Sequence, residues 1–279
     1  MTKPFVKYVG GKSKLLHEIL PRLPKSIDTY YEPFVGGGAV FFALAEQQRF
    51  RSAVIGDTNK ELVCAYVAVQ TQPSLLIAAL SAIESQPDWN TRERYNSMRS
   101  AKFTSVEDRA ARFIYLNKLA FNGLWRVNKK GEFNVPFGSH KTSALFDQGK
   151  ILQASRLLQN TVILPWDYRY TLDLPLKAGP KVADCCYFDP PYAPVSKTAN
   201  FTEYSTEFGV AEQTKLAEVF KTLTHKGMSC VLSNSDTPLV RELYSGFRID
   251  TVFARRSINS NGTKRGPVPE VLISGGCNA

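Results

Sequence analysis

Four consecutive residues, Asp189-Pro190-Pro191-Tyr192, combine groups that can hold an amino group on a planar ring. They follow a nearly continuous apolar run over residues 182–188, which is typical of a strand buried on both faces. The two prolines stiffen the turn and remove two N–H donors. The carboxylate of Asp189 and the carbonyl of Pro190 can each accept one amino hydrogen, while the Tyr192 ring can stack on the base. These four residues are called the DPPY turn below.

Chemistry at such a turn would act on an exocyclic amine of adenine or cytosine. The amine is a poor nucleophile because its lone pair is delocalised into the ring. Two acceptors draw the nitrogen toward tetrahedral geometry and stabilise the positive charge that develops as it attacks. The alternative for this tetrapeptide is a rigid proline turn whose aspartate caps a helix.

A second candidate site lies within the first sixty residues. Gly36-Gly37-Gly38 follows an expected strand over residues 29–34 and precedes an apolar helix start at residues 39–45. Glycines there permit a tight turn and let a ligand approach the backbone. Asp57 ends the next short strand about 20 residues downstream, where a carboxylate can accept both ribose hydroxyls of a nucleoside. A helix N-cap is the alternative for Asp57. Because Phe41 interrupts the GxGxxG pattern, we favour an adenosine-containing cofactor other than NAD.

The elements that must position these residues form an α/β pattern. The first of them follow one another in the order strand, glycine loop, helix, strand and acid, which is how a doubly wound sheet begins. Residues 60–120 have helical periodicity, and glycine-containing pairs break residues 121–141 into turns. Strand patterns return at 161–164, 182–188, 228–232, 247–253 and 268–273, with a helix over 211–223. We therefore predict a sheet domain formed by residues 1–60 and 161–279, with a helical, turn-rich insertion at 61–160 that is longer than ordinary loops.

The composition excludes several classes of protein. The 279 residues are 43% hydrophobic and 22% charged, which rules out wholesale disorder and fibrous repeats. No apolar run reaches the ~18 residues of a membrane-spanning helix, and the N-terminus lacks a secretory signal. Lys and Arg number 35 against 25 Asp and Glu, and the net charge of +10 favours a polyanionic partner. Five cysteines without a CxxC pair predict reduced core thiols in a cytosolic protein and no metal site.

The motifs together, in this order, resemble Dam-type DNA adenine-N6 methyltransferases. The resemblance spans nearly the whole chain. The segments that carry it are Lys7-Tyr8-Val9-Gly10-Gly11-Lys12, Glu32-Pro33-Phe34-Val35-Gly36-Gly37-Gly38, Asp57, Phe121-Asn122-Gly123-Leu124-Trp125-Arg126, Gly131–Gly138, the DPPY turn, Thr198–Thr202 and Leu232-Ser233-Asn234-Ser235.

This resemblance implies an α/β, class I S-adenosylmethionine-dependent methyltransferase sheet with an inserted target-recognition domain. It implies S-adenosylmethionine as methyl donor, adenine N6 in double-stranded DNA as acceptor, and catalysis by Asp189, Pro190, Pro191 and Tyr192. The cofactor contacts that it implies are Tyr8, Gly10, Gly11, Lys12, Glu32, Phe34, Gly36, Asp57, Asp167 and Asp189. For Asp167, a helix cap or a surface acid is an equal alternative.

The resemblance also implies GATC as the target. The DNA contacts expected from it are Lys7, Phe121, Asn122, Leu124, Arg126, Pro136, His140, Arg255 and Arg256. Leu124 can contact a thymine methyl and Arg126 can bridge guanine O6 and N7, with a phosphate contact as the alternative for the arginine. Phe121 can wedge beside a flipped adenine, with a core position as its alternative, and Asn122 can bond DNA or only initiate a turn.

Two positions depart from the family pattern, and the departure concerns recognition of the first base pair. His140 stands where the family usually has Tyr, and Ser139 replaces an expected basic residue. Basic residues are nevertheless dense over residues 118–141 and 251–269, as expected of strips that contact phosphates.

Three other functions fit parts of the pattern. The same turn serves cytosine N4 or RNA amino-methyltransferases. A non-catalytic DNA-binding regulator would have no need of the DPPY turn or the glycine loop, and a nicotinamide enzyme would need the missing GxGxxG. We expect a cytoplasmic, nucleoid-associated enzyme without a metal or a membrane partner. Transfer to one strand at a time is compatible with a monomer.

Overall fold

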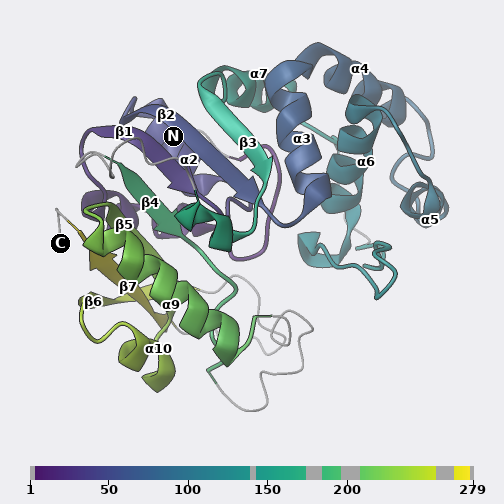
Figure 1. Ribbon diagram of the computed structural model, residues 1–279. Helices are drawn as coiled ribbons and strands as arrows, with labels where there is room; N and C mark the ends of the chain where they lie inside the picture. The colour runs from purple at the N-terminus through teal and green to yellow at the C-terminus, as the bar shows by residue number, and fades with distance from the viewer. Residues whose placement is uncertain (1–3, 139–142, 174–183, 196–207, 256–266, 277–279) are drawn as a thin grey trace. The chain divides into compact units, whose positions relative to one another are not determined.

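A seven-stranded sheet organises the described part of the chain in the hydrogen-bonded order β3-β2-β1-β4-β5-β7-β6 (Figure 1). The computed structural model describes residues 4–138, 143–173, 184–195, 208–255 and 267–276. The strands are β1 (Ile27–Glu32), β2 (Phe50–Asp57), β3 (Thr161–Pro165), β4 (Cys185–Phe188), β5 (Ser229–Ser235), β6 (Arg248–Arg255) and β7 (Pro267–Gly275). Each predicted strand is present with shifted ends, and the predicted α/β sheet is confirmed.

Strand direction places the carboxyl ends of the central strands at one edge of the sheet. β1 pairs in parallel with β2 and β4, and β4 pairs in parallel with β5. β7 is antiparallel to both β5 and β6. All four residues of β4 are buried, as the continuous apolar run predicted. Because ligands bind outside the carboxyl ends of parallel strands, the turn after β4 is well placed for chemistry.

Two compact units divide the chain, and each is described by itself. The first contains residues 1–11, 36–46 and 56–165, and the second contains residues 12–35, 47–55 and 166–279. Helices of the first unit are α2 (Ala39–Glu46), α3 (Lys60–Thr71), α4 (Pro73–Glu84), α5 (Arg92–Ser100), α6 (Val106–Leu119), the short η3 (Phe121–Gly123) and α7 (Gln148–Leu157). The predicted helical character of residues 60–120 is confirmed.

Side-chain caps set where several of these helices begin. Asn59 accepts hydrogen bonds from the backbone N–H groups of Glu61 and Leu62 at the start of α3. Thr91 and Ser105 cap α5 and α6 in the same way. Each cap satisfies a backbone donor that the helix itself leaves without a partner.

The turn-rich segment after α6 folds back on itself around one tryptophan. Trp125 is buried between the rings of Phe113 and Phe133, whose centroids lie 4.4 Å and 4.5 Å from it. Isolated antiparallel bridges join Val127 to Phe133 and Ala120 to Phe137. The expected hairpin-like excursion is therefore present over the described residues up to Gly138.

The second unit is built on β4, β5 and the antiparallel pair. Its helical elements are η1 (Lys12–Lys14), α1 (Leu16–Ile19), η2 (Leu20–Arg22), η4 (Tyr168–Leu172), α9 (Val210–His225) and α10 (Pro238–Leu243). Leu216 and Phe220 of α9 belong to one buried cluster with Phe188 of β4 and Leu232 of β5. This packing fixes α9 beside the turn that follows β4 (Figure 1).

The thiols, the acidic and histidine side chains and the helices of the described residues bear on three kinds of feature: disulfides, metal-binding clusters and membrane-spanning helices. Cys64, Cys185, Cys186 and Cys230 are buried and outside any disulfide, as predicted for core thiols. Over the described ranges, no cluster of three or more His, Cys, Asp or Glu residues is arranged to hold a metal ion. No single described helix has the length and apolar character to cross a membrane; α3 and α4, bent by 116°, pass that test only as a joined pair.

Candidate active site and nucleic-acid interface

The DPPY turn carries an ion-paired carboxylate at the end of β4. Lys12 Nζ lies 2.7 Å from Asp189 Oδ1, and the two side chains are only 8% and 19% exposed. Ser233 Oγ donates a hydrogen bond of 2.9 Å to the same oxygen. Leu232 is the register partner of Phe188, so the parallel pairing of β4 and β5 brings Ser233 beside Asp189. An ammonium and a hydroxyl thus hold the carboxylate in one orientation.

The ring of the DPPY turn is held at both its face and its hydroxyl. The Lys12 ammonium lies 4.7 Å from the centroid of the Tyr192 ring, within cation–π range. Tyr192 Oη donates a 2.8 Å hydrogen bond to Glu270 Oε2 on β7. Burial, and then the nearby Asp189, raise the pKa of the Tyr192 phenol, so the hydroxyl stays protonated as a donor. The arrangement suits the holding of a planar amine: an acceptor carboxylate stands beside a fixed aromatic ring.

A buried pair of amides supports the opposite side of this turn. Asn234 Oδ1 accepts a 2.9 Å hydrogen bond from Ala193 N. Gln213 Nε2 donates a 2.9 Å hydrogen bond to the carbonyl of Pro191. Asn234 belongs to the family motif, but neither Gln213 nor Glu270 was expected from the sequence. For Glu270 a signal existed, since it is a lone acid within the apolar run of β7; for Gln213, within a polar helix, there was none.

In the first unit, Asp57 sits at the end of β2 and binds the glycine loop. Its Oδ2 accepts a 3.2 Å hydrogen bond from Gly36 N, and its Oδ1 accepts a 2.9 Å bond from Asn59 N. Burial raises the pKa of the Asp57 carboxyl to about 6, because desolvation outweighs these backbone donors. Asn59, not Asp57, caps α3, so the N-cap alternative for Asp57 does not hold.

Two features favour glycine at position 36. Its φ of +46° belongs to the left-handed region, and a Cβ there would lie 3.1 Å from Cδ1 of the Tyr8 ring. Tyr8 Oη in turn accepts a 3.3 Å hydrogen bond from Asn59 Nδ2. Gly11 N donates to the carbonyl of Tyr8 at 3.3 Å, with Gly10 at a φ of +80°. Tyr8, Gly36 and Asp57, distant in sequence, are therefore brought together as one cluster.

The other expected cofactor residues of the second unit have partners of their own. Glu32 is buried and accepts a 2.9 Å hydrogen bond from Tyr30 Oη. Phe34 stacks on Tyr168, with centroids 5.5 Å apart and an interplanar angle of 24°. Asp167 caps η4 and forms an ion pair with Arg169, so the helix-cap alternative describes its present contacts.

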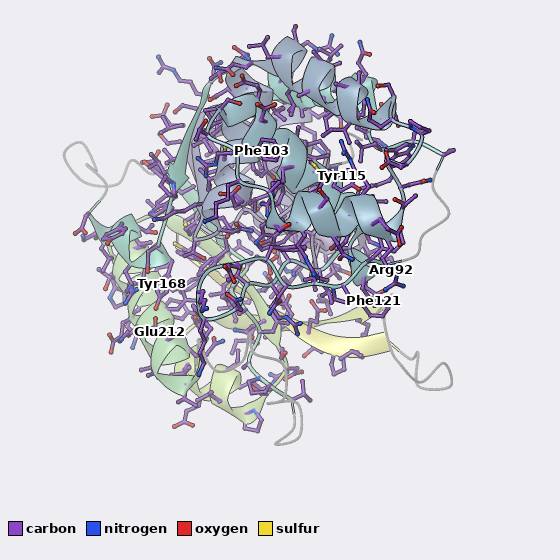
Figure 2. The ribbon with its side chains drawn as sticks, turned by 90° about the vertical axis from the view of Figure 1, so that its right-hand side faces the viewer. Arg92, Phe103, Tyr115, Phe121, Tyr168 and Glu212 are labelled. Carbon is purple, nitrogen blue, oxygen red and sulfur yellow. The ribbon has the colours of Figure 1, made fainter. Side chains whose placement is uncertain are left out.

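The hydroxyl of Tyr168 also binds the first turn of α9. Tyr168 Oη donates a 2.8 Å hydrogen bond to Glu212 Oε2, and Figure 2 shows the two residues side by side. Burial and this carboxylate raise the pKa of the Tyr168 phenol, which keeps it a donor. The aromatic pair Phe34–Tyr168 is thereby tied to the helix that supports the DPPY turn.

The recognition segment exposes the side chains expected to face DNA. Phe121 is 50% exposed and Leu124 is 36% exposed, whereas the intervening anchor Trp125 is 8% exposed. A core position for Phe121, which is labelled in Figure 2, is thus excluded. Arg126 Nε donates a 2.8 Å hydrogen bond to Asn134 Oδ1, which fixes the direction of the guanidinium.

Two of the remaining expected DNA residues, Lys7 and Pro136, are held through hydrogen bonds of their backbone groups. Asn117 bonds both backbone groups of Lys7, accepting from its N–H at 3.1 Å and donating to its carbonyl at 2.7 Å. Phe121 N donates to the carbonyl of exposed Pro136 at 2.9 Å. Asn122 has a φ of +55°, as a turn residue does. Arg255 is the last residue of β6, and Ser139, His140 and Arg256 lie outside the described residues.

Comparison with known proteins identifies the family. A profile described as D12 class N6 adenine-specific DNA methyltransferase matches residues 8–258. The type II methyltransferase M.MjaIII of Methanocaldococcus jannaschii is 39% identical over 279 residues, covering 94% of this chain and 95% of that protein. The type II methyltransferase M1.LlaDCHI of Lactococcus lactis subsp. cremoris is 38% identical over 282 residues, covering 98% and 95%. The DNA adenine methylase of Escherichia coli strain K12 is 36% identical over 274 residues, covering 97% and 94%.

These matches extend over almost the full length of the chain and of its relatives. The expected activity on adenine N6 of DNA and the expected methyl donor are both confirmed. The chain belongs to the D12 class of N6 adenine-specific DNA methyltransferases, which are S-adenosylmethionine-dependent enzymes.

Proposed function

We propose that this enzyme methylates adenine within GATC in double-stranded DNA and that the DPPY turn holds the adenine during transfer. The observation that carries the target is the recognition segment. Leu124 and Arg126 are exposed on either side of buried Trp125, so both can reach base edges from a rigid anchor. A leucine can contact the thymine methyl, and an arginine can bridge guanine O6 and N7.

The residues of the glycine loop fit S-adenosylmethionine. The Asp57 carboxylate is desolvated and bonded by backbone N–H groups, so hydroxyl donors of a ribose would suit its remaining lone pairs. When bound, the cofactor supplies an electrophilic methyl group on a positively charged sulfur. We propose that it is held by the residues named from the family resemblance: Tyr8, Gly10, Gly11, Lys12, Glu32, Phe34, Gly36, Asp57, Asp167 and Asp189.

We propose that the chain orients the adenine amine and stabilises its developing charge electrostatically. Asp189 and the Pro190 carbonyl accept the two amino hydrogens, and the Tyr192 ring stacks on the base. Acceptors fixed before reaction stabilise the positive charge that grows on the nitrogen without having to reorganise. Ser233 and Lys12 already orient the carboxylate in this way. Asp189 need not act as a strong base before attack, because the amino proton can leave after methyl transfer.

We also propose that residues 61–160 form the DNA-recognition domain and that residues 1–60 and 161–279 form the catalytic domain. Phe121 would wedge beside the flipped adenine, since its ring is half-exposed on a segment fixed by the Pro136 carbonyl. Lys7, Asn122, His140, Arg255 and Arg256 complete the proposed DNA contacts. One chain carries both sets of residues, so we propose a monomer that acts in the cytoplasm, where its DNA substrate would lie.

The test uses labelled S-adenosylmethionine with an unmethylated duplex that contains GATC and a matched duplex that lacks it. The product is digested to nucleosides and the labelled base is identified. Label in N6-methyladenine only with GATC supports the target and makes His140 a tolerated substitution. Label in adenine at another sequence contradicts the target and turns attention to Ser139 and His140. Absence of label in both duplexes contradicts GATC and would redirect the search to other DNA sequences.

A further inference from the structure

Two side-chain amides are buried directly behind the DPPY turn. Gln213 lies in the first turn of α9 and is 1% exposed, and Asn234 lies in β5 and is fully buried. Asn234 Nδ2 donates a 3.0 Å hydrogen bond to Gln213 Oε1. Amides are rarely buried so completely unless their donors and acceptors are used.

The pair binds the third residue of the turn and the residue that directly follows the turn. Gln213 Nε2 donates to the Pro191 carbonyl at 2.9 Å, and Asn234 Oδ1 accepts from Ala193 N at 2.9 Å. The same Asn234 oxygen also accepts from Ser235 N at 2.8 Å. Together these bonds join α9, β5 and the DPPY turn into one connected network.

The turn needs such support from outside because two prolines remove two of its backbone donors. Its carbonyls must therefore be satisfied by other groups or by the substrate. A donor on the Pro191 carbonyl fixes the peptide that follows the Pro190 carbonyl, which is the group proposed to accept an amino hydrogen. Fully satisfied buried amides favour one conformation, since any other leaves polar groups without partners at a cost of about 1–3 kcal/mol each.

The start of α9 is itself held in place by a neighbour of Gln213. Gly209 precedes the helix and supplies no side-chain cap. Glu212 instead accepts the 2.8 Å hydrogen bond of Tyr168 Oη (Figure 2). The helix turn that carries Gln213 is therefore anchored by a tertiary contact, as a side chain that positions another group requires.

We propose that Gln213 is a positioning residue for methyl transfer, which acts through the Pro191 carbonyl and Asn234 to hold the DPPY turn in its reactive conformation. It touches neither base nor cofactor in this role. The proposal rests on the proposed role of the DPPY turn. It implies that loss of Gln213 lowers kcat much more than it weakens binding, because misplaced groups cost rate while the binding surfaces remain.

The first test replaces Gln213 by leucine, which keeps the volume and removes both polar contacts. Steady-state kinetics on the DNA that the wild type methylates should give a kcat lower by about 10- to 100-fold. The dissociation constants for S-adenosylmethionine and for DNA should each stay within about threefold of wild type. The matched control is E218Q on the exposed face of the same helix, which should retain wild-type kcat. A kcat for Q213L within about twofold of wild type overturns the proposal.

A second variant separates positioning from mere stability. In Q213E, a protonated carboxyl can donate to the Pro191 carbonyl and accept from Asn234, whereas the ionised form repels that carbonyl. Burial raises the pKa of a carboxyl group, so the protonated fraction of the introduced group should grow as the pH falls. The ratio of variant to wild-type kcat, at saturating cofactor and DNA, should therefore rise as the pH falls. Asp189, Glu212 and Glu270 are common to both proteins, so the wild type measured over the same pH range is the reference for the variant.

A ratio that does not change with pH overturns the proposal even if Q213L is poorly folded. Loss of cofactor and DNA binding in proportion to kcat, together with a lower melting temperature, also overturns it, because that pattern is purely structural. The proposed function is tested separately by the wild type. If wild-type methylation occurs outside GATC, the target is wrong while the Gln213 comparison still stands. If Q213L matches the wild type, only the positioning role is lost.

Discussion

Lys12 Nζ occupies a position between Asp189 Oδ1, 2.7 Å away, and the Tyr192 ring, whose centroid is 4.7 Å away. A positively charged nitrogen therefore contacts both groups that we propose to hold the adenine amine. The amine becomes positively charged only as it attacks, so the same carboxylate and ring are suited to that developing charge. The ammonium also keeps a mostly buried carboxylate paired, since an unpaired buried charge is strongly unfavourable.

Replacing Lys12 by methionine should lower kcat by about 10²- to 10³-fold. Without the ammonium, the mostly buried Asp189 carboxylate loses its charged partner and is no longer held in its accepting orientation. Steady-state kinetics at saturating DNA and S-adenosylmethionine measure the loss. K14M, at an exposed lysine two residues away, is the matched control and should behave as wild type. Equal kcat values for both variants would exclude this role of Lys12.

Asp189→Ala should abolish methylation, with a loss on the order of 10³-fold or more, because it removes the acceptor closest to the proposed reacting nitrogen. DNA binding by a gel-shift or anisotropy measurement should stay close to wild type, since the phosphate-contacting residues are unchanged. Near-normal turnover would contradict the assignment of the DPPY turn.

Glu270 should matter through Tyr192 alone. Tyr192→Phe keeps the ring and removes the 2.8 Å hydrogen bond to Glu270, so kcat should fall only about two- to tenfold. Glu270→Gln keeps an acceptor oxygen, so its kcat should fall by less than that of Tyr192→Phe. In the Y192F background, Glu270→Gln should have no additional effect, because the partner hydroxyl is already missing. Additive losses in this double-mutant cycle would show that Glu270 acts elsewhere.

Cofactor affinity should depend on pH through Asp57. Burial raises the pKa of this carboxyl to about 6, and only the ionised form accepts both ribose hydroxyls. The dissociation constant for S-adenosylmethionine should therefore increase by up to about tenfold for each pH unit below about pH 6. Because the folded chain binds this proton more tightly than the unfolded chain, acidification through this range favours folding at Asp57 and cannot itself unfold the site. Calorimetric titration of D57N should give weaker binding without this pH dependence; a parallel pH dependence in D57N would assign it to another group.

Much of the fold and of the candidate site was predictable because it is encoded locally. The apolar run of β4 and the proline turn after it specify a buried strand and the end of that strand. The glycine loop was likewise predictable, since the positive φ at Gly36 favours glycine. The strand pattern before Asp57 placed that residue at the end of β2. Such features depend on a few neighbouring residues, and so their signals survive in one sequence.

Contacts made by ordinary polar residues across the fold were not predictable. Gln213 is one glutamine in a polar helix, and only the packing of α9 on β5 turns it toward the Pro191 carbonyl. Asn134 holds Arg126 across a chain reversal whose geometry depends on the burial of Trp125. The role of such residues follows from tertiary placement and not from their type or spacing.

Arg126 should set sequence preference at one base pair. Its Nε is bonded to Asn134 Oδ1, so the guanidinium is directed and can discriminate between bases by geometry. Arg126→Ala should reduce discrimination at that pair by about 1–3 kcal/mol, which is about 5- to 150-fold in kcat/KM between the matched and substituted duplexes. Asn134→Ala should produce a smaller loss at the same base pair, because it frees the guanidinium without removing it.

Lys129, an exposed lysine three residues along, provides the control that separates base reading from phosphate attraction. Lys129→Ala should weaken binding to all duplexes equally. It should also reduce the slope of log affinity against log salt concentration by about 1. Arg126→Ala should leave that slope nearly unchanged, since a base edge releases no condensed counterion. Methylation rates on a panel of single-base variants of the target, measured at two salt concentrations, distinguish the two outcomes. A uniform loss across the panel for Arg126→Ala, with a reduced salt slope, would make Arg126 a phosphate contact and leave recognition to other residues of the segment.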